Sequence, residues 1–245
     1  MYIEGRNAVI EALKAEYPLK RILIAQGTKS DKALDLLAKL ARNQQVKVTQ
    51  PARRELDELS ERGAHQGVIA EAAPFGYAQL DEVLATIEAS ALIIVLDHIT
   101  DPGNLGAIVR SAEVVGAACV VVPDRRSAAV TPAAFKAAAG ALAHLPLVQV
   151  TNIAQTIESL QAAGFWVAGA SEHAEQLAWD APLSGKIALV MGSEGSGLAR
   201  LTQERCDFLV KLPVRGEVGS LNVAQACTAL SYEWLRQSSS GLSSG

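Results

Sequence analysis

The sequence predicts an α/β protein in which short apolar strands alternate with helices and form a parallel sheet covered on both faces. One observation is a set of continuous apolar runs, such as Ala91–Leu96 and Ala118–Val122, that suit strands buried on both faces. A second is the helical spacing of apolar residues in the segments between these runs. A third is the composition, 49% hydrophobic but only 4% aromatic, which indicates a core of Ala, Val, Leu and Ile.

The length of 245 residues suits two unequal domains better than one. Residues 73–79 carry Pro74 and Gly76 between two patterned regions and are predicted to be a linker. We therefore expect a small domain over residues 1–72 and a larger one over residues 80–237. The Ser- and Gly-rich end, residues 238–245, is expected to be a disordered tail.

The small domain is predicted to alternate three helices with three strands. Val9, Ile10 and Leu13 have the spacing of one helix face. Ser30 or Asp31 is the expected N-cap of the middle helix. The predicted helices span residues 5–16, 31–42 and 51–61, and the predicted strands span residues 21–26, 46–50 and 65–71.

The larger domain is predicted to begin with a helix at residues 80–88 and to continue with alternating strands and helices. Asn104 is the expected N-cap of the second of these helices. Predicted strands span residues 91–96, 118–122, 145–150 and 165–170, and two further apolar runs precede Gly192 and Pro213. Predicted helices span residues 105–116, 131–142, 153–163 and 221–237.

Charge and composition exclude several classes of protein. A net charge of −4 argues against a generic nucleic-acid coat, although residues 1–76 hold 12 Lys and Arg against 10 Asp and Glu. The three cysteines and four histidines lack the spacing of a disulfide framework or a metal site, so we expect no metal. No apolar run approaches the roughly 20 residues of a membrane span, and the start lacks a signal-peptide pattern. The expected location is the cytoplasm, without membrane contact.

Two loops, Gly192–Gly197 and Pro213–Ser220, follow apolar runs and precede helical patterns. Loops of this kind have free N–H groups and are where α/β proteins bind ligands. The sequence G-S-E-G-S-G is neither G-x-G-x-x-G nor a P-loop, and Glu194 would repel a phosphate. Arg110, in the apolar context I-V-R-S-A, either pairs with a carboxylate such as Glu194 or Glu113, or binds an anionic substrate.

Three stretches together resemble the motifs of the SpoU-type (TrmH-like) RNA 2′-O-ribose methyltransferases of the SPOUT superfamily. They are D-H-I-T-D-P-G-N-L-G-A-I-V-R-S-A-E at 97–113, A-L-V-M-G-S-E-G-S-G-L at 188–198 and L-P-V-R-G-E-V-G-S-L-N-V-A-Q-A at 212–226. The N-terminal region, with Y-I-E-G-R-N-A-V-I-E-A-L and H-Q-G-V-I-A, is similar to the L30e-like substrate-binding domain of that family. The resemblance is nearest to the enzymes that methylate a guanosine ribose in 23S ribosomal RNA.

The resemblance implies a parallel sheet with a deep trefoil knot and S-adenosylmethionine as the cofactor. By position in the motifs, the cofactor-binding residues would be Met191, Gly192, Val210, Leu212, Ser220 and Leu221. The catalytic residues would be Asn104, Arg110, Glu194, Ser220 and Asn222. Because a guanidinium is a poor base, we assign Arg110 to holding the RNA phosphate and stabilising the developing alkoxide. A homodimer is also implied, with the helices of the first motif and the C-terminus packed across its two-fold axis.

Three other interpretations compete with this one. A transfer-RNA ribose methyltransferase would share the chemistry, but the simplest of these enzymes generally lack an L30e-like domain. A knotted, non-catalytic RNA-binding protein is disfavoured because Asn104, Arg110, Glu194 and Asn222 are all present. A nicotinamide-dependent oxidoreductase is disfavoured by the missing dinucleotide fingerprint.

Overall fold

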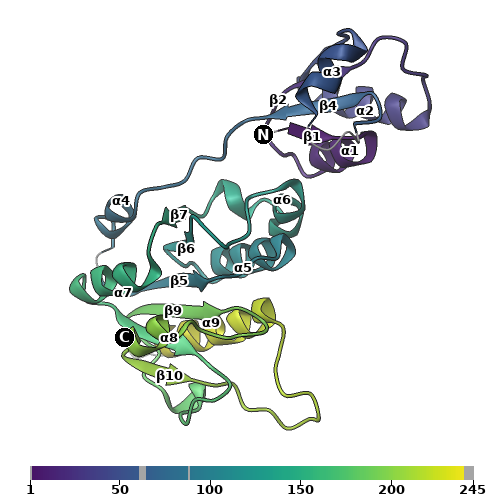
Figure 1. The fold of residues 1–245 in the computed structure, drawn as a ribbon. Coiled ribbons are helices and arrows are strands. Elements are labelled where there is room, and N and C mark those ends of the chain that lie inside the picture. The colour runs from purple at the N-terminus through teal and green to yellow at the C-terminus, as the bar shows by residue number, and fades with distance from the viewer. Residues whose placement is uncertain (1, 61–64, 88, 240–245) are drawn as a thin grey trace. The chain divides into compact units, whose positions relative to one another are not determined.

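The computed structural model describes residues 2–60, 65–87 and 89–239, which form two compact units (Figure 1). The first comprises Met1–Gly76 and Val130–Lys136, and the second Tyr77–Ala129 and Ala137–Gly245. Residues 77–79, expected in the linker, therefore group with the second unit. Their attachment is visible at Ala78, whose N–H donates to the carbonyl oxygen of Leu147 at 2.9 Å.

The first unit is a four-stranded sheet with three helices. Its strands lie in the order β1 (Tyr2–Glu4), β4 (Val68–Ala72), β2 (Leu19–Ile24), β3 (Lys47–Thr49). Its helices are α1 (Arg6–Lys14), α2 (Lys32–Asn43) and α3 (Arg53–Leu59). The strand β4 runs antiparallel to both neighbours, whereas β2 and β3 are parallel. The strand β1 was not predicted, because three residues are too few to display an alternating pattern.

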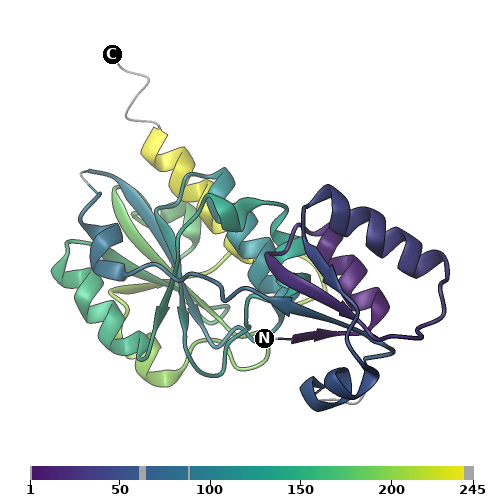
Figure 2. The same ribbon diagram turned by 90° about the horizontal axis from the view of Figure 1, so that it is seen from above.

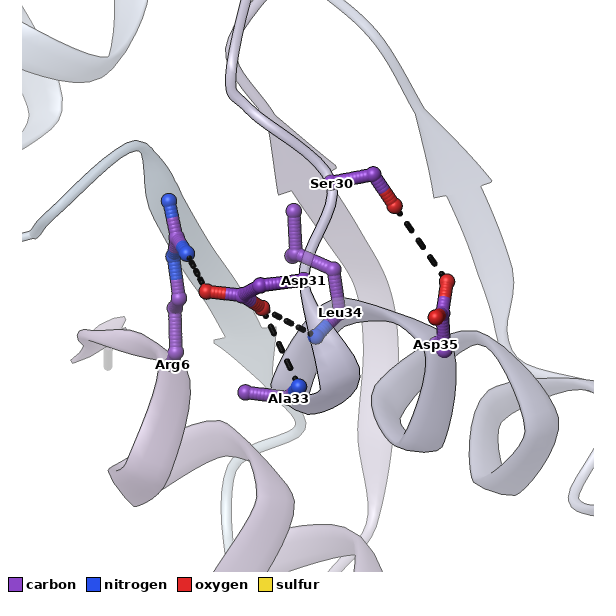
Figure 3. Close-up of polar contacts among 6 residues, drawn as sticks. All are labelled: Arg6, Ser30, Asp31, Ala33, Leu34 and Asp35. Carbon is purple, nitrogen blue, oxygen red and sulfur yellow. Dashed lines mark hydrogen bonds and ion pairs between the residues drawn. The ribbon is translucent and has the colours of Figure 1, made fainter.

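The start of α2 is fixed by Asp31, one of the two predicted N-caps (Figure 3). Its Oδ1 accepts hydrogen bonds from the N–H groups of Ala33 and Leu34, each at 3.0 Å. Its other oxygen forms an ion pair with Arg6, the first residue of α1. The Leu34 N–H and the nearby Arg6 guanidinium lower the pKa of Asp31. One carboxylate thus joins the first turns of two helices.

The second unit is built on a six-stranded, fully parallel sheet, as the sequence predicted. The strands lie in the order β10, β8, β9, β5, β6, β7. Their bounds are β5 Ala91–Asp97, β6 Cys119–Pro123, β7 Leu147–Val150, β8 Trp166–Ala170, β9 Lys186–Gly192 and β10 Phe208–Val210. All seven residues of β5 are buried, which explains its continuous apolar run.

Helices cover both faces of this sheet (Figure 2). The helices α5 (Pro102–Val114) and α9 (Val223–Ser239) pack against each other on one face. On the other face lie α4 (Leu80–Leu84), α7 (Ile153–Ala162) and α8 (Arg200–Arg205). A core of buried Ile, Val and Leu side chains joins that face to α4 and α7. No helix in the described ranges is both long and apolar enough to cross a membrane.

Several helix ends differ from the prediction. The helix expected at 131–142 is divided into α6 (Pro132–Ala138) and a short 3-10 helix, Ala141–Ala143. Gly140, with φ of 94°, interrupts it, because a helix cannot continue through a left-handed residue. The helix α4 ends at Leu84, and Glu88, at its predicted end, lies outside the described residues. The helix α9 continues to Ser239, two residues into the predicted tail, and residues 240–245 lie outside the described part.

Candidate active site

The carboxyl ends of β8, β9 and β10 meet at one edge of the sheet and surround a cavity of about 760 Å³. The loops that follow these three strands line it, together with the first turns of α9. All six predicted cofactor-binding residues contribute to the lining: Met191, Gly192, Val210, Leu212, Ser220 and Leu221. The two glycine-bearing loops, Gly192–Gly197 and Pro213–Ser220, therefore open at the same edge of the parallel sheet.

The loop after β9 turns sharply because Gly192 has no side chain. A Cβ built on Gly192 would lie 2.2 Å from the carbonyl carbon of Gly197 and 2.4 Å from the nitrogen of Leu198. The turn is closed by two backbone hydrogen bonds between Ser193 and Gly197, at 3.0 and 2.9 Å. Gly192 thus allows the backbone to fold back on itself at the floor of the cavity.

The start of α5 corrects the prediction for Asn104. The N-cap is Asp101, whose Oδ1 accepts a hydrogen bond from the Asn104 N–H at 2.7 Å. Pro102 occupies the first helical position, where its missing N–H has no consequence. Asn104 therefore lies within the first turn, and its side chain is available for other contacts.

Those contacts join the three motifs. Asn104 Nδ2 donates to Glu194 Oε1 at 3.1 Å, and Asn222 Nδ2 donates to the same oxygen at 2.5 Å. Asn222 Nδ2 also lies 2.9 Å from Asn104 Oδ1 and donates to it. The Val223 N–H is a further donor to Glu194 Oε1, at 3.3 Å. One carboxylate oxygen is thus held by groups at the starts of α5 and α9, while Oε2 has no hydrogen-bond partner among the described residues.

Asn222 has a second role as the N-cap of α9. Its Oδ1 accepts hydrogen bonds from the N–H groups of Ala224 at 2.9 Å and Gln225 at 3.4 Å. The two ends of a single amide therefore start a helix and orient Glu194. The predicted helix start at Leu221 lies two residues earlier than the observed start at Val223.

Arg110 is not brought into this network. It lies six residues after Asn104 on α5, which turns its side chain away from the face that carries Asn104. Arg110 is exposed and, among the described residues, has no hydrogen bond or ion pair. Among the described residues, Arg110 forms no pair with Glu194 or Glu113. Ser220 lines the cavity but likewise lies outside the Asn104–Glu194–Asn222 network.

The cavity has the character of a small-molecule site. Its volume lies within the range of about 300–1,000 Å³ that such pockets have. Met191, Leu198, Val210 and Leu230 are buried apolar residues of the lining, and Glu194 adds a negative charge. Across the described part of the chain, no three His, Cys, Asp or Glu side chains cluster as a metal site would require.

Two residues of the site were not singled out from the sequence. Asp101 was not predicted to cap α5, although Asp before Pro at a helix start is a recognisable signal. Asp97 ends β5, and its Oδ1 lies 2.5 Å from His98 Nδ1. It is fully buried and also accepts a hydrogen bond from the Ala199 N–H at 2.7 Å. A carboxylate ending a fully apolar strand was the available signal.

Comparison with known proteins assigns the family. Residues 91–232 match the model of the SpoU rRNA Methylase family, and residues 2–78 match the model described as RNA 2'-O ribose methyltransferase substrate binding. The chain belongs to the SpoU rRNA methylase family and is thus a methyltransferase. The family that the sequence motifs predicted is confirmed.

Relatives match over almost the entire length. A protein of Pseudomonas putida named 23S rRNA (guanosine-2'-O-)-methyltransferase RlmB is 46% identical over 240 residues, 96% of each chain. The protein of the same name from Pseudomonas aeruginosa is 43% identical, again over 96% of each chain.

A solved structure supports the fold. The SpoU methyltransferase AviRb from Streptomyces viridochromogenes, in complex with AdoMet, has a TM-score of 0.65 at 28% identity. The match covers 97% of this chain and 89% of that one. The α/β fold with a small N-terminal unit and a C-terminal parallel sheet is thus confirmed, while the trefoil knot stays a prediction.

Proposed function

We propose that this protein transfers a methyl group from S-adenosylmethionine to the ribose 2′-hydroxyl of a guanosine in 23S ribosomal RNA. The observation that carries the proposal is the Asn104–Glu194–Asn222 network, which unites the three motifs beside the 760 Å³ cavity. The substrate is proposed from the relatives at 43–46% identity, whose names specify guanosine-2'-O methylation of 23S rRNA.

The lining of the cavity suits the proposed cofactor. Backbone groups of Gly192, Leu212 and Leu221 would hydrogen-bond the adenine and ribose, and Met191 and Val210 would form apolar walls. S-adenosylmethionine, when bound, supplies a methyl group carried on a positively charged sulfur. Glu194 contributes a negative charge that favours a sulfonium cation and disfavours a phosphate.

Asn104 and Asn222 would act by fixing Glu194. Their amide groups hold Oε1, so the remaining oxygen keeps a constant direction toward the incoming ribose. Methylation of a 2′-hydroxyl forms one O–C bond and releases one proton, so catalysis depends on alignment and on easing that proton loss. Ser220, on the cavity lining, would help to align the ribose.

Arg110 would bind the RNA rather than the cofactor. Its guanidinium is exposed and lacks a protein partner among the described residues, so it is free to contact a phosphate. A guanidinium that is charged at every accessible pH can stabilise a developing alkoxide but is a poor proton acceptor.

The remaining parts of the proposal concern partners and location. Residues 1–72 would form an L30e-like domain that holds the RNA, which agrees with the substrate-binding family model over residues 2–78. A homodimer would cover α5 and α9, where Val114 is 60% exposed and Tyr232 is 49% exposed. A ribosomal RNA substrate is consistent with a cytoplasmic location, and no metal is required by this chemistry.

The test is methyl transfer from labelled S-adenosylmethionine to unmodified 23S rRNA and, separately, to bulk unmodified tRNA. Both RNAs are then digested and their nucleosides separated. We expect label in 2′-O-methylguanosine from the ribosomal RNA alone. Label in tRNA alone would overturn the proposed substrate while keeping the chemistry. If neither naked RNA is labelled, the assay is repeated on ribosomal particles that contain unmodified 23S rRNA. Absence of label there too would overturn the activity.

A further inference from the structure

Asp97 is a buried carboxylate that the reaction described above does not use. It is the last residue of β5, is 0% exposed, and pairs in register with Gly192 of β9. Burial of a carboxylate is unfavourable unless both oxygens are hydrogen-bonded. Both are: Oδ2 accepts from the Ala199 N–H at 2.7 Å, and Oδ1 lies 2.5 Å from His98 Nδ1.

The bond to Ala199 closes the far end of the loop after β9. This loop leaves the sheet at Gly192, folds back through the Ser193–Gly197 backbone pair, and meets α8 at Ala199, its N-cap. Between these two anchors the loop carries Glu194 and contributes seven consecutive residues, 192–198, to the cavity lining. Gly192 is paired with Asp97 in the β5–β9 ladder, so Asp97 holds both ends of the loop.

The contact between Asp97 and His98 lies at the start of the segment that carries Asn104. His98 has φ of 63°, a left-handed conformation, and turns the chain from β5 toward the loop that leads to Asn104. Asp97 therefore lies where the segment carrying Asn104 and the loop carrying Glu194 separate from the sheet. These two side chains meet again at the hydrogen bond of 3.1 Å described above.

We propose that Asp97 is a positioning residue, whose hydrogen bond to the Ala199 N–H holds the 192–198 loop in the shape that binds the cofactor and aims Glu194. The role rests on the proposed function, because the shape of the loop matters to catalysis only if the cavity holds S-adenosylmethionine. Asp97 does not line the cavity and would act through the loop.

The first experiment needs no cofactor. Hydrogen exchange of backbone amides is measured on the full chain for the wild type, Asp97→Ala, Asp97→Asn and Asn152→Ala. Asn152 is a matched control, because it caps α7 through the Gln155 N–H at 3.1 Å and does not line the cavity. We expect faster exchange at Ser193, Gly197 and Ala199 in Asp97→Ala alone, and near-normal exchange in Asp97→Asn, which keeps an acceptor for Ala199. Unchanged exchange in Asp97→Ala would overturn the proposal.

A second variant removes the same bond from the other side. Ala199→Pro deletes the N–H donor, and the φ of −60° at Ala199 is one that proline adopts. It leaves β5 untouched, so it remains informative if Asp97→Ala fails to fold. S-adenosylhomocysteine binding is measured by calorimetry for both variants. We expect roughly tenfold or greater weakening in both, against a less than threefold change in Asn152→Ala.

The outcomes separate this proposal from the proposed function. If the wild type binds the probe and both Asp97→Ala and Ala199→Pro bind it equally well, the positioning role is wrong. If the wild type fails to bind the probe, the proposed function is wrong, and the exchange experiment still decides whether Asp97 holds the loop.

Discussion

The Asn222 side-chain amide donates a hydrogen bond of 2.5 Å to Glu194, across 28 residues of sequence, while its oxygen caps α9. Helix formation and orientation of the carboxylate are therefore linked through one planar group. Because the two ends of the amide have different roles, substitutions can separate them.

Asn222→Asp should keep the cap and lose the orientation of Glu194. Aspartate can still accept from the Ala224 N–H, but it cannot donate to Glu194 and adds a second negative charge beside it. We expect near-normal stability with methyl transfer reduced about 100-fold or more. Asn222→Ala should in addition lower the free energy of unfolding by about 1 kcal/mol. Urea denaturation and single-turnover kinetics measure the two effects, and equal turnover in Asn222→Asp and wild type would contradict the role.

Gly192→Ala should disrupt the loop after β9. The added methyl group would meet the backbone of Gly197 at 2.2 Å, which no rotamer change can relieve, so the turn must shift. We expect destabilisation of about 1–3 kcal/mol and a clear loss of S-adenosylmethionine binding. Gly195→Ala is the control, because a Cβ there meets nothing within 4 Å. Calorimetry on both variants checks the prediction, and similar affinities would reject it.

Arg110→Lys should reduce turnover without affecting cofactor binding. Lysine keeps the charge but loses the planar fork that binds a phosphate with two parallel hydrogen bonds. Because Arg110 has no partner among the described residues, we expect unchanged stability and a loss of roughly 100-fold in methyl transfer. Arg200→Lys, an exposed arginine on α8 that pairs with Glu204, serves as the comparison and should be near-normal. Full activity of Arg110→Lys would exclude the assignment.

Alkaline pH should destabilise the fold through Cys227. Burial raises the pKa of this thiol from 9.0 to about 12, so the folded state keeps a proton that the unfolded state loses above pH 9. Stability from this group is complete below pH 9 and declines as pH rises toward 12, by up to about 1.4 kcal/mol per pH unit. The free energy of unfolding between pH 8 and pH 10 should therefore fall less steeply in Cys227→Ala. Parallel slopes would show that the thiol does not contribute.

Negative charges introduced on the exposed faces of α5 and α9 should disrupt the proposed homodimer. Val114 on α5 and Tyr232 on α9 are exposed hydrophobic side chains on two helices that pack together, as the 2.7 Å bond between Ser111 and Thr228 shows. We expect wild type to scatter light as a dimer at micromolar concentration and Val114→Glu with Tyr232→Glu to be monomeric. Leu201→Glu, which alters an exposed leucine on α8, is the control. A monomeric wild type would reject the dimer.

Much of the fold could be predicted because the larger unit obeys a simple rule. Parallel strands covered on both faces are continuously apolar, and β5 and β6 are buried at every position. The glycine loop was recognisable from local sequence, since Gly192 permits a backbone approach that no other residue allows. The six predicted cofactor-binding residues, all of which line the cavity, were assigned by their positions in the family motifs. The order and spacing of these motifs fix their place at the sheet edge.

Other features depend on contacts that no local pattern encodes. The start of α5 was misplaced because Asn104 and Asp101 are both good caps, and Pro102 decides between them. The burial of Asp97 is visible only when Ala199, 102 residues later, donates to it. The short strand β1 is specified by pairing with β4, not by its own three residues.

The position of β9 has a consequence for synthesis of the chain. This strand inserts beside β5, its partner from about a hundred residues earlier, and α9 at the end of the described chain completes the cavity lining. As the polypeptide emerges from the ribosome, the edge of β5 that pairs with β9 therefore stays unpaired until Lys186–Gly192 has been translated. The cavity is therefore complete only after α9 has also been translated.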